Sequence, residues 1–374
     1  MIYLDNASTT KIYPEVLEKI IICIEEYGNP SSNHKMGRKA KVAIENARKN
    51  IAEILNITPS EVFFTSSGSE SNNNILYHAA ESLKIKNFIS SKIEHDSVYE
   101  TMIFLKKKHG INIHYIDILE KGEICLKSLE KILAKNTNSF VSLMHINNES
   151  GNISDIEKIG DLCKFYKSYF HSDCVQSVGK EKLNLSKINV DYISASAHKF
   201  HGPKGVGIMM AKNSNISPMI CGGAQEKNIR AGTENVAGII GCEEALKISV
   251  QNLEKDTFKV QKLKSKIIEN IYSTEKFILN DSSLKSTNYS PYILNIGIKS
   301  KNEDNLIIYL LDNKNICASS SSACSSGVEK KSRVAENIYK NKNINPLRIS
   351  LCRYNTEEEI NYFCKTLLEV VKSL

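Results

Sequence analysis

The stretch YISASAHKFHGPKG, residues 192–205, places a lysine just after a short apolar strand and ahead of a Gly-Pro turn. Ser196 and His198 precede this lysine, Lys199, in the sequence. A lysine that forms a Schiff base must be partly removed from water to be nucleophilic near neutral pH. Lys199 is therefore a candidate Schiff-base lysine, and Lys204 is a rival on composition alone.

Strand-like and helix-like patterns alternate on both sides of this stretch. Short apolar runs occupy residues 61–65, 88–90, 140–146, 169–171, 192–195 and 206–211. Between them, apolar residues recur at helical spacing, as in the segment 75–83. This alternation predicts an α/β domain with a mostly parallel sheet. Ligands of such sheets bind at the carboxyl ends of the strands.

The last third of the chain has a different pattern. A Lys/Glu-rich helical segment, 237–269, is followed by a strand at 292–298, a helix at 306–311, a serine-rich stretch at 319–326 and a final strand–helix pair. We expect a large domain over residues 15–250. A smaller α+β domain is expected over 1–14 and 251–374.

Three chemical groups meet at the predicted strand ends. Ser66 to Ser71 join a strand to a helix, which is typical of a phosphate cradle but also of an ordinary capped turn. Asp173 ends a strand, where it would meet a ligand cation or cap the next helix. With Lys199, these groups supply what a pyridoxal phosphate site needs: a phosphate anchor, a pyridinium partner and a lysine.

Charge and hydropathy exclude several classes of protein. The 374 residues carry a net charge of +7, from 49 basic and 42 acidic residues, and the basic ones are scattered. A nucleic-acid-binding face needs a concentrated basic stripe, so direct nucleic-acid binding is not expected. No run approaches the ~18 apolar residues that span a bilayer. Because Met1 leads into the sequence without a targeting segment, we expect a cytoplasmic protein with no membrane partner.

The ten cysteines include one that stands apart. No two are spaced as Cys-x-x-Cys, so neither a disulfide framework nor a metal site is predicted. Cys324 lies in the serine-rich stretch, where no apolar neighbours would bury its thiol.

The motifs together resemble those of the NifS/IscS-type cysteine desulfurases, which are pyridoxal-phosphate enzymes of the class V aminotransferase family with the fold type I architecture. The resemblance covers essentially the whole chain. It is carried by YLDNASTT at 3–10, Glu70, Glu94-His95, Asn147-Asn148-Glu149, Asp173-x-x-Gln176, Ser196-x-His198-Lys199, Arg230-Ala231-Gly232-Thr233, Ser322-Ala323-Cys324-Ser325 and Arg348-Ile349-Ser350-Leu351.

The resemblance implies a role for each matching residue. Lys199 would bind the cofactor and move protons, Asp173 would pair with the pyridinium nitrogen, and Cys324 would be the nucleophile. The remaining roles follow the same pattern: ring stacking and proton transfer by His95, a bond to the ring hydroxyl from Gln176, phosphate binding by Gly68, Ser69, Ser196 and His198 with Thr233 from the partner of a homodimer, and substrate-carboxylate binding by Asn148 and Arg348. Arg348 is one of only six arginines, and a two-pronged contact to a carboxylate suits arginine better than lysine.

The activity implied is the conversion of L-cysteine to L-alanine with a persulfide left on Cys324. The sulfur would pass to an acceptor protein, either an iron–sulfur scaffold or a tRNA thiouridylase. A selenocysteine lyase or another class V aminotransferase-like enzyme is the alternative. An inactive interaction or RNA-binding protein on the same fold would have lost Lys199, Asp173 or Cys324, and all three are present.

The sequence departs from the family pattern at a few positions. Ser321 stands where the pattern has glycine, Ser67 and Gly68 replace Gly-Ala, and Ser69 replaces threonine. Small residues and a hydroxyl remain, so phosphate binding is still expected. Cys352 follows Leu351 where glycine is usual.

Overall fold

The computed structural model describes residues 1–214, 216–272, 274–279, 288–299, 306–320, 332–340 and 344–373. Within these residues seven strands form one sheet in which a single strand, β8, runs against the others. In spatial order the strands are β2 (Val62–Thr65), β8 (Gly207–Ala211), β7 (Tyr192–Ser196), β6 (Tyr169–Asp173), β5 (Phe140–Ser142), β3 (Asn87–Ser90) and β4 (Asn112–Tyr115). The expectation of a mostly parallel α/β sheet is confirmed.

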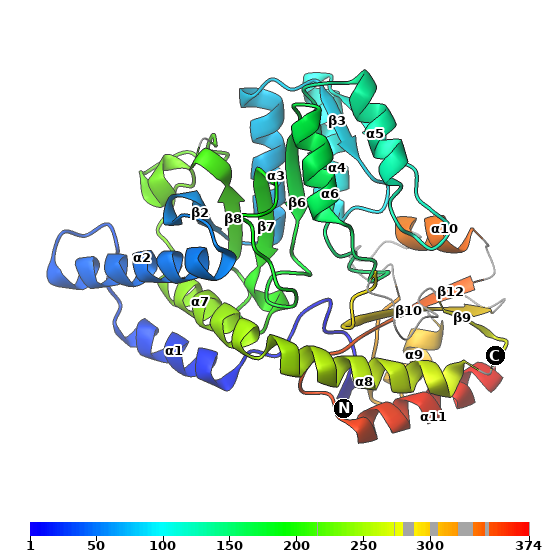
Figure 1. Cartoon of the computed structure of the whole chain (residues 1–374). Helices are drawn as coiled ribbons and strands as arrows, with labels where there is room; N and C mark the ends of the chain where they lie inside the picture. Colours follow the sequence, from blue (N-terminus) through cyan, green and yellow to red (C-terminus); the bar gives the residue numbers. More distant parts are fainter. Residues whose placement is uncertain are drawn as a thin grey trace.

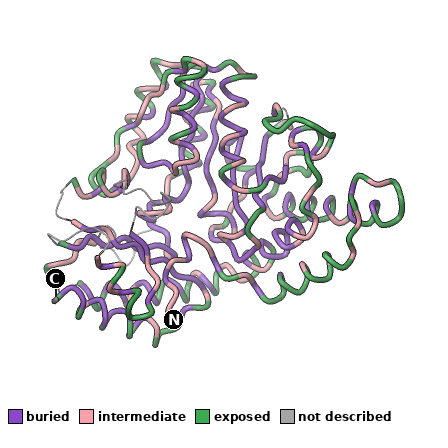
Figure 2. Tube along the Cα trace, turned by 180° about the vertical axis from the view of Figure 1, so that it is seen from behind, coloured by how far each residue is buried: buried purple, intermediate pink, exposed green. Residues whose placement is uncertain are grey.

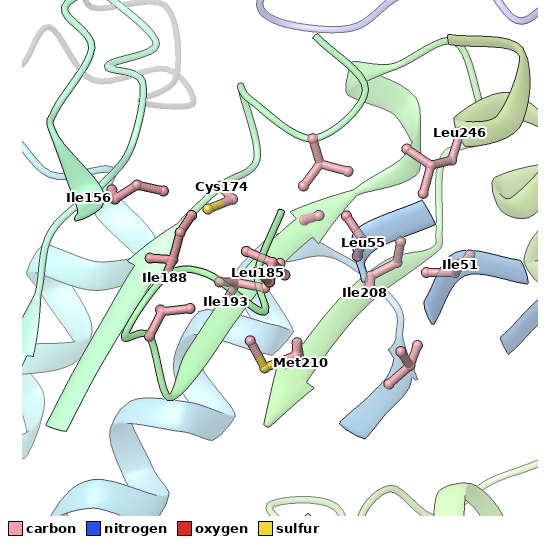
Figure 3. Packing of buried hydrophobic residues seen from close by; sticks show 14 of the residues in the cluster. Ile51, Leu55, Ile156, Cys174, Leu185, Ile188, Ile193, Ile208, Met210 and Leu246 are labelled. Carbon is pink, nitrogen blue, oxygen red and sulfur yellow. The ribbon is translucent and has the colours of Figure 1, made fainter. Parts of the chain in front are cut away.

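Helices cover both faces of this sheet (Figure 1). They are α2 (Lys35–Leu55), α3 (Gly68–Tyr77), α4 (Asp96–His109), α5 (Leu126–Lys135), α6 (Ile156–Phe165) and α7 (Val236–Gln251). Because side chains alternate along a strand, neighbouring residues enter different cores. Phe140 packs with the α3 and α4 side, whereas Val141 packs with the α2, α6 and α7 side. Figure 3 shows part of the core that contains Val141, with Ile51 and Leu55 of α2 near Ile208.

A second set of elements packs beside the large sheet. It contains α8 (Leu253–Ile271), α9 (Leu306–Asp312), α10 (Arg333–Tyr339), α11 (Glu357–Ser373), the antiparallel strands β9 (Phe277–Leu279), β10 (Ile293–Lys299) and β12 (Ile344–Ser350), and the parallel pair β1 (Ile2–Tyr3) and β11 (Ile316–Cys317). Leu4 and Ala7 belong to the separate hydrophobic core of these elements. The division of the chain near residue 250 into two domains stays a prediction.

The helical segment predicted over 237–269 consists of two helices, because the chain breaks at Asn252 between α7 and α8. The Asn252 side chain donates to the Ile248 oxygen at 2.9 Å. Asparagine competes in this way with the backbone hydrogen bonds of a helix and favours its end. After the break, α8 runs along the other members of the smaller set of elements, beside α11 (Figure 1).

Helix α1 (Pro14–Glu25) and the start of α2 form an exposed arm (Figure 2). Along α1 only Val16 is buried, while Ile21, Ile22 and Ile24 are more than half exposed.

None of the helices in the described ranges has the length and apolar character needed to cross a membrane.

A buried ion pair holds the loop that leads to Arg230 and Thr233. Arg48 of α2 donates to both carboxylate oxygens of Glu226, at 2.8 and 2.7 Å, and both side chains are 2% exposed. Glu226 also accepts from the Phe64 N–H at 2.8 Å. Its φ of 42° lies in the left-handed region, which a non-glycine residue rarely adopts. The ion pair thus secures a strained turn.

We expect Arg48→Met to lower the free energy of unfolding by about 3–5 kcal/mol, because the buried Glu226 carboxylate would lose its cationic partner and keep only the Phe64 N–H. The double variant Arg48→Met, Glu226→Gln should be more stable than Arg48→Met alone. Urea unfolding followed by circular dichroism measures both. A loss below about 1 kcal/mol for Arg48→Met, or a double variant less stable than the single one, would contradict this account.

Candidate active site

A cavity of about 300 Å³ opens at the carboxyl ends of β2, β6 and β7, where the sequence predicted a ligand site. This volume is at the low end of small-molecule pockets. The predicted site residues that line it are Gly68, Ser69, His95, Asn148, Asp173, Gln176, Ser196, His198 and Lys199. The cavity therefore brings together residues from widely separated parts of the sequence.

Lys199 lies in the short turn that follows β7. Its Nζ donates to the backbone oxygens of Ala7 and Ser8, at 2.7 Å each. The same amino-terminal segment bonds to the lysine's own turn, since the Thr10 N–H donates to the His198 oxygen at 2.9 Å. The ammonium is thus fixed by carbonyl oxygens at the edge of the cavity.

Asp173 and His95 are connected by hydrogen bonds through two side chains that the sequence analysis missed. The Asn72 amide donates to Asp173 Oδ2 at 2.7 Å and to Ser97 Oγ at 2.8 Å. Ser97 Oγ lies 2.8 Å from His95 Nδ1, which also accepts from the Ser97 N–H at 3.1 Å. Because Nδ1 accepts a hydrogen bond, the neutral imidazole carries its proton on Nε2.

The start of α3, where the sequence predicted a phosphate cradle, has the geometry of an anion-binding turn. Ser67 caps the helix by accepting from the Glu70 N–H at 3.2 Å, which leaves the N–H groups of Gly68 and Ser69 at the cavity. A Cβ at Gly68 would lie only 2.6 Å from Val175 Cγ2, so this position has no room for a larger residue. Free helical N–H groups with the positive end of the helix dipole favour an anion here.

His198 lies in the same part of the cavity. Its Nδ1 is 3.1 Å from Thr9 Oγ1. Burial, followed by the charges of Lys199, Lys204 and Lys180, lowers the pKa of His198 to about 4. The imidazole is therefore neutral at pH 7 and contacts an anion as a hydrogen-bonding group rather than as a cation.

Arg348 of β12 lies beside this cavity, buried in the structure. It donates to the Asn148 backbone oxygen at 3.0 Å, to Asp5 at 2.7 Å and to Ser8 Oγ at 2.7 Å. Its Nε is buried and has no partner among the described residues. A buried N–H donor without a protein partner is a group that a ligand can satisfy.

Among the described site residues that the sequence predicted, Arg348 and Thr233 do not line the cavity. Thr233 is exposed and lines another hollow, with Arg230 and Ser66. Cys324 lies outside the described residues, as does the stretch 321–331 around it. The described residues on either side contact the site: Ser319 pairs with the Arg348 backbone, and Ser332 Oγ donates to the Glu149 carboxylate.

The donor set fits pyridoxal phosphate. Asp173 offers a carboxylate for a pyridinium nitrogen, Lys199 an amine for the aldehyde, and the α3 start an anion cradle for the phosphate. His95, which caps α4, also lines the cavity. Each of the three functional parts of the cofactor therefore has a matching group.

Of the two residues that the sequence analysis missed, Asn72 left a signal. It belongs to the run Ser71-Asn72-Asn73-Asn74 inside α3, and asparagine is a poor helix former. Ser71, Asn72 and Asn74 are nevertheless buried. A buried run of polar residues in a helix indicates a function other than packing. Ser97 left no comparable signal.

Comparisons with known proteins agree with this geometry. The family model described as Aminotransferase class-V matches residues 2–363. The cysteine desulfurase IscS of Dictyoglomus turgidum is 38% identical, with 100% of this chain and 95% of that protein aligned. A solved NifS-like protein superposes with a TM-score of 0.91, at 36% identity and full coverage of both chains. SspA in complex with cysteine superposes with a TM-score of 0.82, at 29% identity, over 95% of this chain and 100% of that one.

Next to His95, Glu94 is a buried carboxyl group that accepts from Ser91 Oγ at 2.8 Å and the Met144 N–H at 3.2 Å. Burial raises its pKa from 4.5 to about 8. Between pH 4.5 and about 8, the Glu94 carboxyl keeps its proton in the folded chain and loses it in the unfolded chain. The free energy of unfolding therefore falls as pH rises through this window.

We expect Glu94→Gln, which mimics the protonated acid, to remove this contribution to the pH dependence. At each pH, we compare the free energy of unfolding of Glu94→Gln with that of the original protein. The variant's advantage should be larger at pH 8 than at pH 5 by more than about 1 kcal/mol. Urea unfolding at the two pH values measures the difference, with the exposed Glu120→Gln as control. An equal gain at both pH values would show that Glu94 is ionised in the folded protein.

Proposed function

Since the chain belongs to the class-V aminotransferase family and is a pyridoxal-phosphate-dependent cysteine desulfurase, we propose that it converts L-cysteine to L-alanine and keeps the sulfur as a persulfide on Cys324. The observation that carries this proposal is the single cavity that holds Lys199, Asp173, His95 and the start of α3. Of the structures compared, SspA was solved with cysteine bound.

The cavity residues divide into those that hold the cofactor and those that hold the substrate. When bound, pyridoxal phosphate withdraws electrons from the substrate's α-carbon. Asp173 would keep the ring nitrogen protonated, and the Gly68 and Ser69 N–H groups, with Ser196 and His198, would bind the phosphate. His95 would stack on the ring, and Gln176 would donate to the ring oxygen.

The substrate carboxylate binds between Arg348 and Asn148. Arg348 is already oriented by Asp5 and Ser8, so little conformational entropy is lost when it takes a ligand. This contact turns the α-carbon toward Lys199, whose amine removes and returns its proton. His95 presents Nε2–H on the other side of the proton path and assists the transfer.

Sulfur transfer then balances without an added oxidant or reductant. The Cys324 thiolate attacks the substrate sulfur and forms the S–S bond, while the C–S bond breaks and its electron pair stays with the substrate carbon. That carbon takes a proton and becomes the methyl group of alanine. The net change converts one cysteine and one enzyme thiol into one alanine and one enzyme persulfide.

We expect Cys324→Ala to lower alanine formation from L-cysteine by at least about 100-fold, because the nucleophile is lost. The absorption band of the bound cofactor should remain. The measurement is alanine and sulfide release in the presence of a thiol reductant. Cys352→Ala and Cys317→Ala are the matched controls, since both thiols lie in the described part and neither lines the cavity. Alanine formation that does not depend on Cys324 would contradict the proposed nucleophile.

A homodimer is part of the proposal. Thr233 is exposed outside the cavity of its own chain, so we propose that it donates to the phosphate of a second copy. The neighbouring residues Glu234 to Ala237 line a hollow with Ile24 and Tyr27 of the exposed arm. Burial of its apolar side chains against a partner would stabilise such a dimer.

Mixing two variants tests this arrangement. Lys199→Ala and Thr233→Ala should each be impaired alone, whereas a mixture unfolded and refolded together should regain activity. A mixed dimer has one site with an intact Lys199 from one copy and an intact Thr233 from the other. If Thr233 acts within its own chain, mixing restores nothing.

We further propose that the persulfide sulfur passes to an acceptor protein, either an iron–sulfur scaffold or a tRNA thiouridylase. A persulfide needs a nucleophile to receive its outer sulfur, which fits either acceptor. A cytoplasmic location also belongs to the proposal. It is supported by the cysteines, because every one in the described part is a free thiol, as is usual in a reducing compartment.

A further inference from the structure

Behind Gln176 lies a buried lysine to which the proposed reaction assigns no role. Lys180 is 7% exposed, and its Nζ donates to Gln176 Oε1 at 3.1 Å. The ring of Tyr292 lies 5.9 Å from the ammonium. Gln176 lines the cavity, so Lys180 is one residue away from the bound ligand.

The turn that carries Lys180 is held close to the lysine of the site. Gly179 has a φ of 78°, and a Cβ there would lie 2.8 Å from Phe200 Cβ, directly after Lys199. Because Gly179 directly precedes Lys180, this close approach holds Lys180 next to the turn that carries Lys199. Only glycine permits both this φ and this approach.

The electrostatic surroundings of Lys180 are unusual for a buried lysine. The groups that act on its charge, after burial itself, are Lys199, the Cys352 thiol and Arg348, of which two are cations. Burial first, then Lys199 and Arg348, lower the pKa of Lys180 to about 7, against the opposing effect of Cys352. A buried ammonium with no carboxylate partner in the described part of the chain is costly to the folded state, which indicates a function for Lys180.

The hydrogen bond to Lys180 determines which end of the Gln176 amide faces the site. When Lys180 is protonated it has only donors, and in the structure it takes the amide oxygen of Gln176. The Gln176 Nε2 lies at the other end of the amide and donates to the Ala7 oxygen at 2.8 Å. Because the amide nitrogen has two N–H groups and Gln176 lines the cavity, the second N–H remains for an oxygen atom of a ligand.

We propose that Lys180 is a positioning residue that locks the Gln176 amide with its N–H groups toward the cavity and places positive charge behind them. The ligand group this arrangement recognises is an anionic ring oxygen, as in the phenolate of pyridoxal phosphate. The inference rests on the proposed binding of that cofactor. Lys180 and the Ala7 oxygen hold the two ends of the amide. Without Lys180 the amide oxygen is left without its donor, and only the bond to Ala7 still opposes an inverted amide whose oxygen would face the ring oxygen and repel it.

The test is a titration of the apoenzyme with pyridoxal phosphate, read by the absorption of the bound cofactor. We expect Lys180→Met to raise the dissociation constant by about 10- to 100-fold, as for loss of a hydrogen bond to a charged group, and to shift the absorption band. Methionine is apolar and of similar length, and removing an unpaired buried charge favours folding. Lys180→Arg, which keeps a cation that has only donors, should recover most of the affinity.

A double-variant comparison separates positioning from a structural effect. In a Gln176→Leu background Lys180→Met should change the dissociation constant by less than about 2-fold, since no amide remains to be oriented. Lys264→Met is the matched control. Lys264 is 5% exposed and donates to the Ser290 oxygen at 2.9 Å, away from the cavity.

An equal effect of Lys180→Met in both backgrounds, an equal effect of Lys264→Met, or unchanged affinity would overturn the inference. Failure of the original protein to bind pyridoxal phosphate would instead overturn the proposed function. The two failures are therefore distinguishable in one experiment.

Discussion

The backbone oxygens of Ala7 and Ser8 are the contacts on which the site depends most. They hold Lys199 Nζ, while Asp5 and the Ser8 hydroxyl of the same short segment hold Arg348. This short segment, residues 5–8, thus sets the position of Lys199, the proposed proton-moving amine, relative to Arg348, the proposed carboxylate-binding residue. Leu4 and Ala7 pack into the hydrophobic core of the smaller set of elements. These elements therefore fix the segment against the large sheet. Substrate geometry is therefore a consequence of how the two cores pack together.

The same region concentrates positive charge that the folded chain only partly balances. Lys180, Lys199 and Arg348 lie near each other, so Lys180 has two cations in its surroundings, with the Cys352 thiol beside them. The carboxylates of Asp5 and Asp173 are already engaged, with Arg348 and Asn72 respectively. A ligand that brings a phosphate, a ring oxygen and a carboxylate would supply the missing negative charge. The preference for an anionic cofactor and substrate thus follows from the fold's own electrostatics.

Much of the sheet and its edge could be predicted from sequence, and the reasons are local. The strands around Asp173 and Lys199 are short apolar runs followed by polar residues, so their ends are visible in the sequence. Arrangements that depend on tertiary contacts were not visible. The Asn72–Ser97–His95 connection joins α3 to α4, and the Lys180–Gln176 contact depends on a turn shaped by Gly179. The break at Asn252 was missed because helical spacing continues on both sides of it.

The most direct test of the whole account is to identify the lysine that holds the cofactor. Borohydride reduction of the holoenzyme fixes pyridoxal phosphate to its lysine as a stable amine, and peptide mass spectrometry then locates it. The structure predicts the modification on Lys199, whose Nζ lies at the cavity with Asp173 and His95. Modification of Lys204 or Lys180 instead, or of no lysine in a protein that carries the cofactor, would contradict the account.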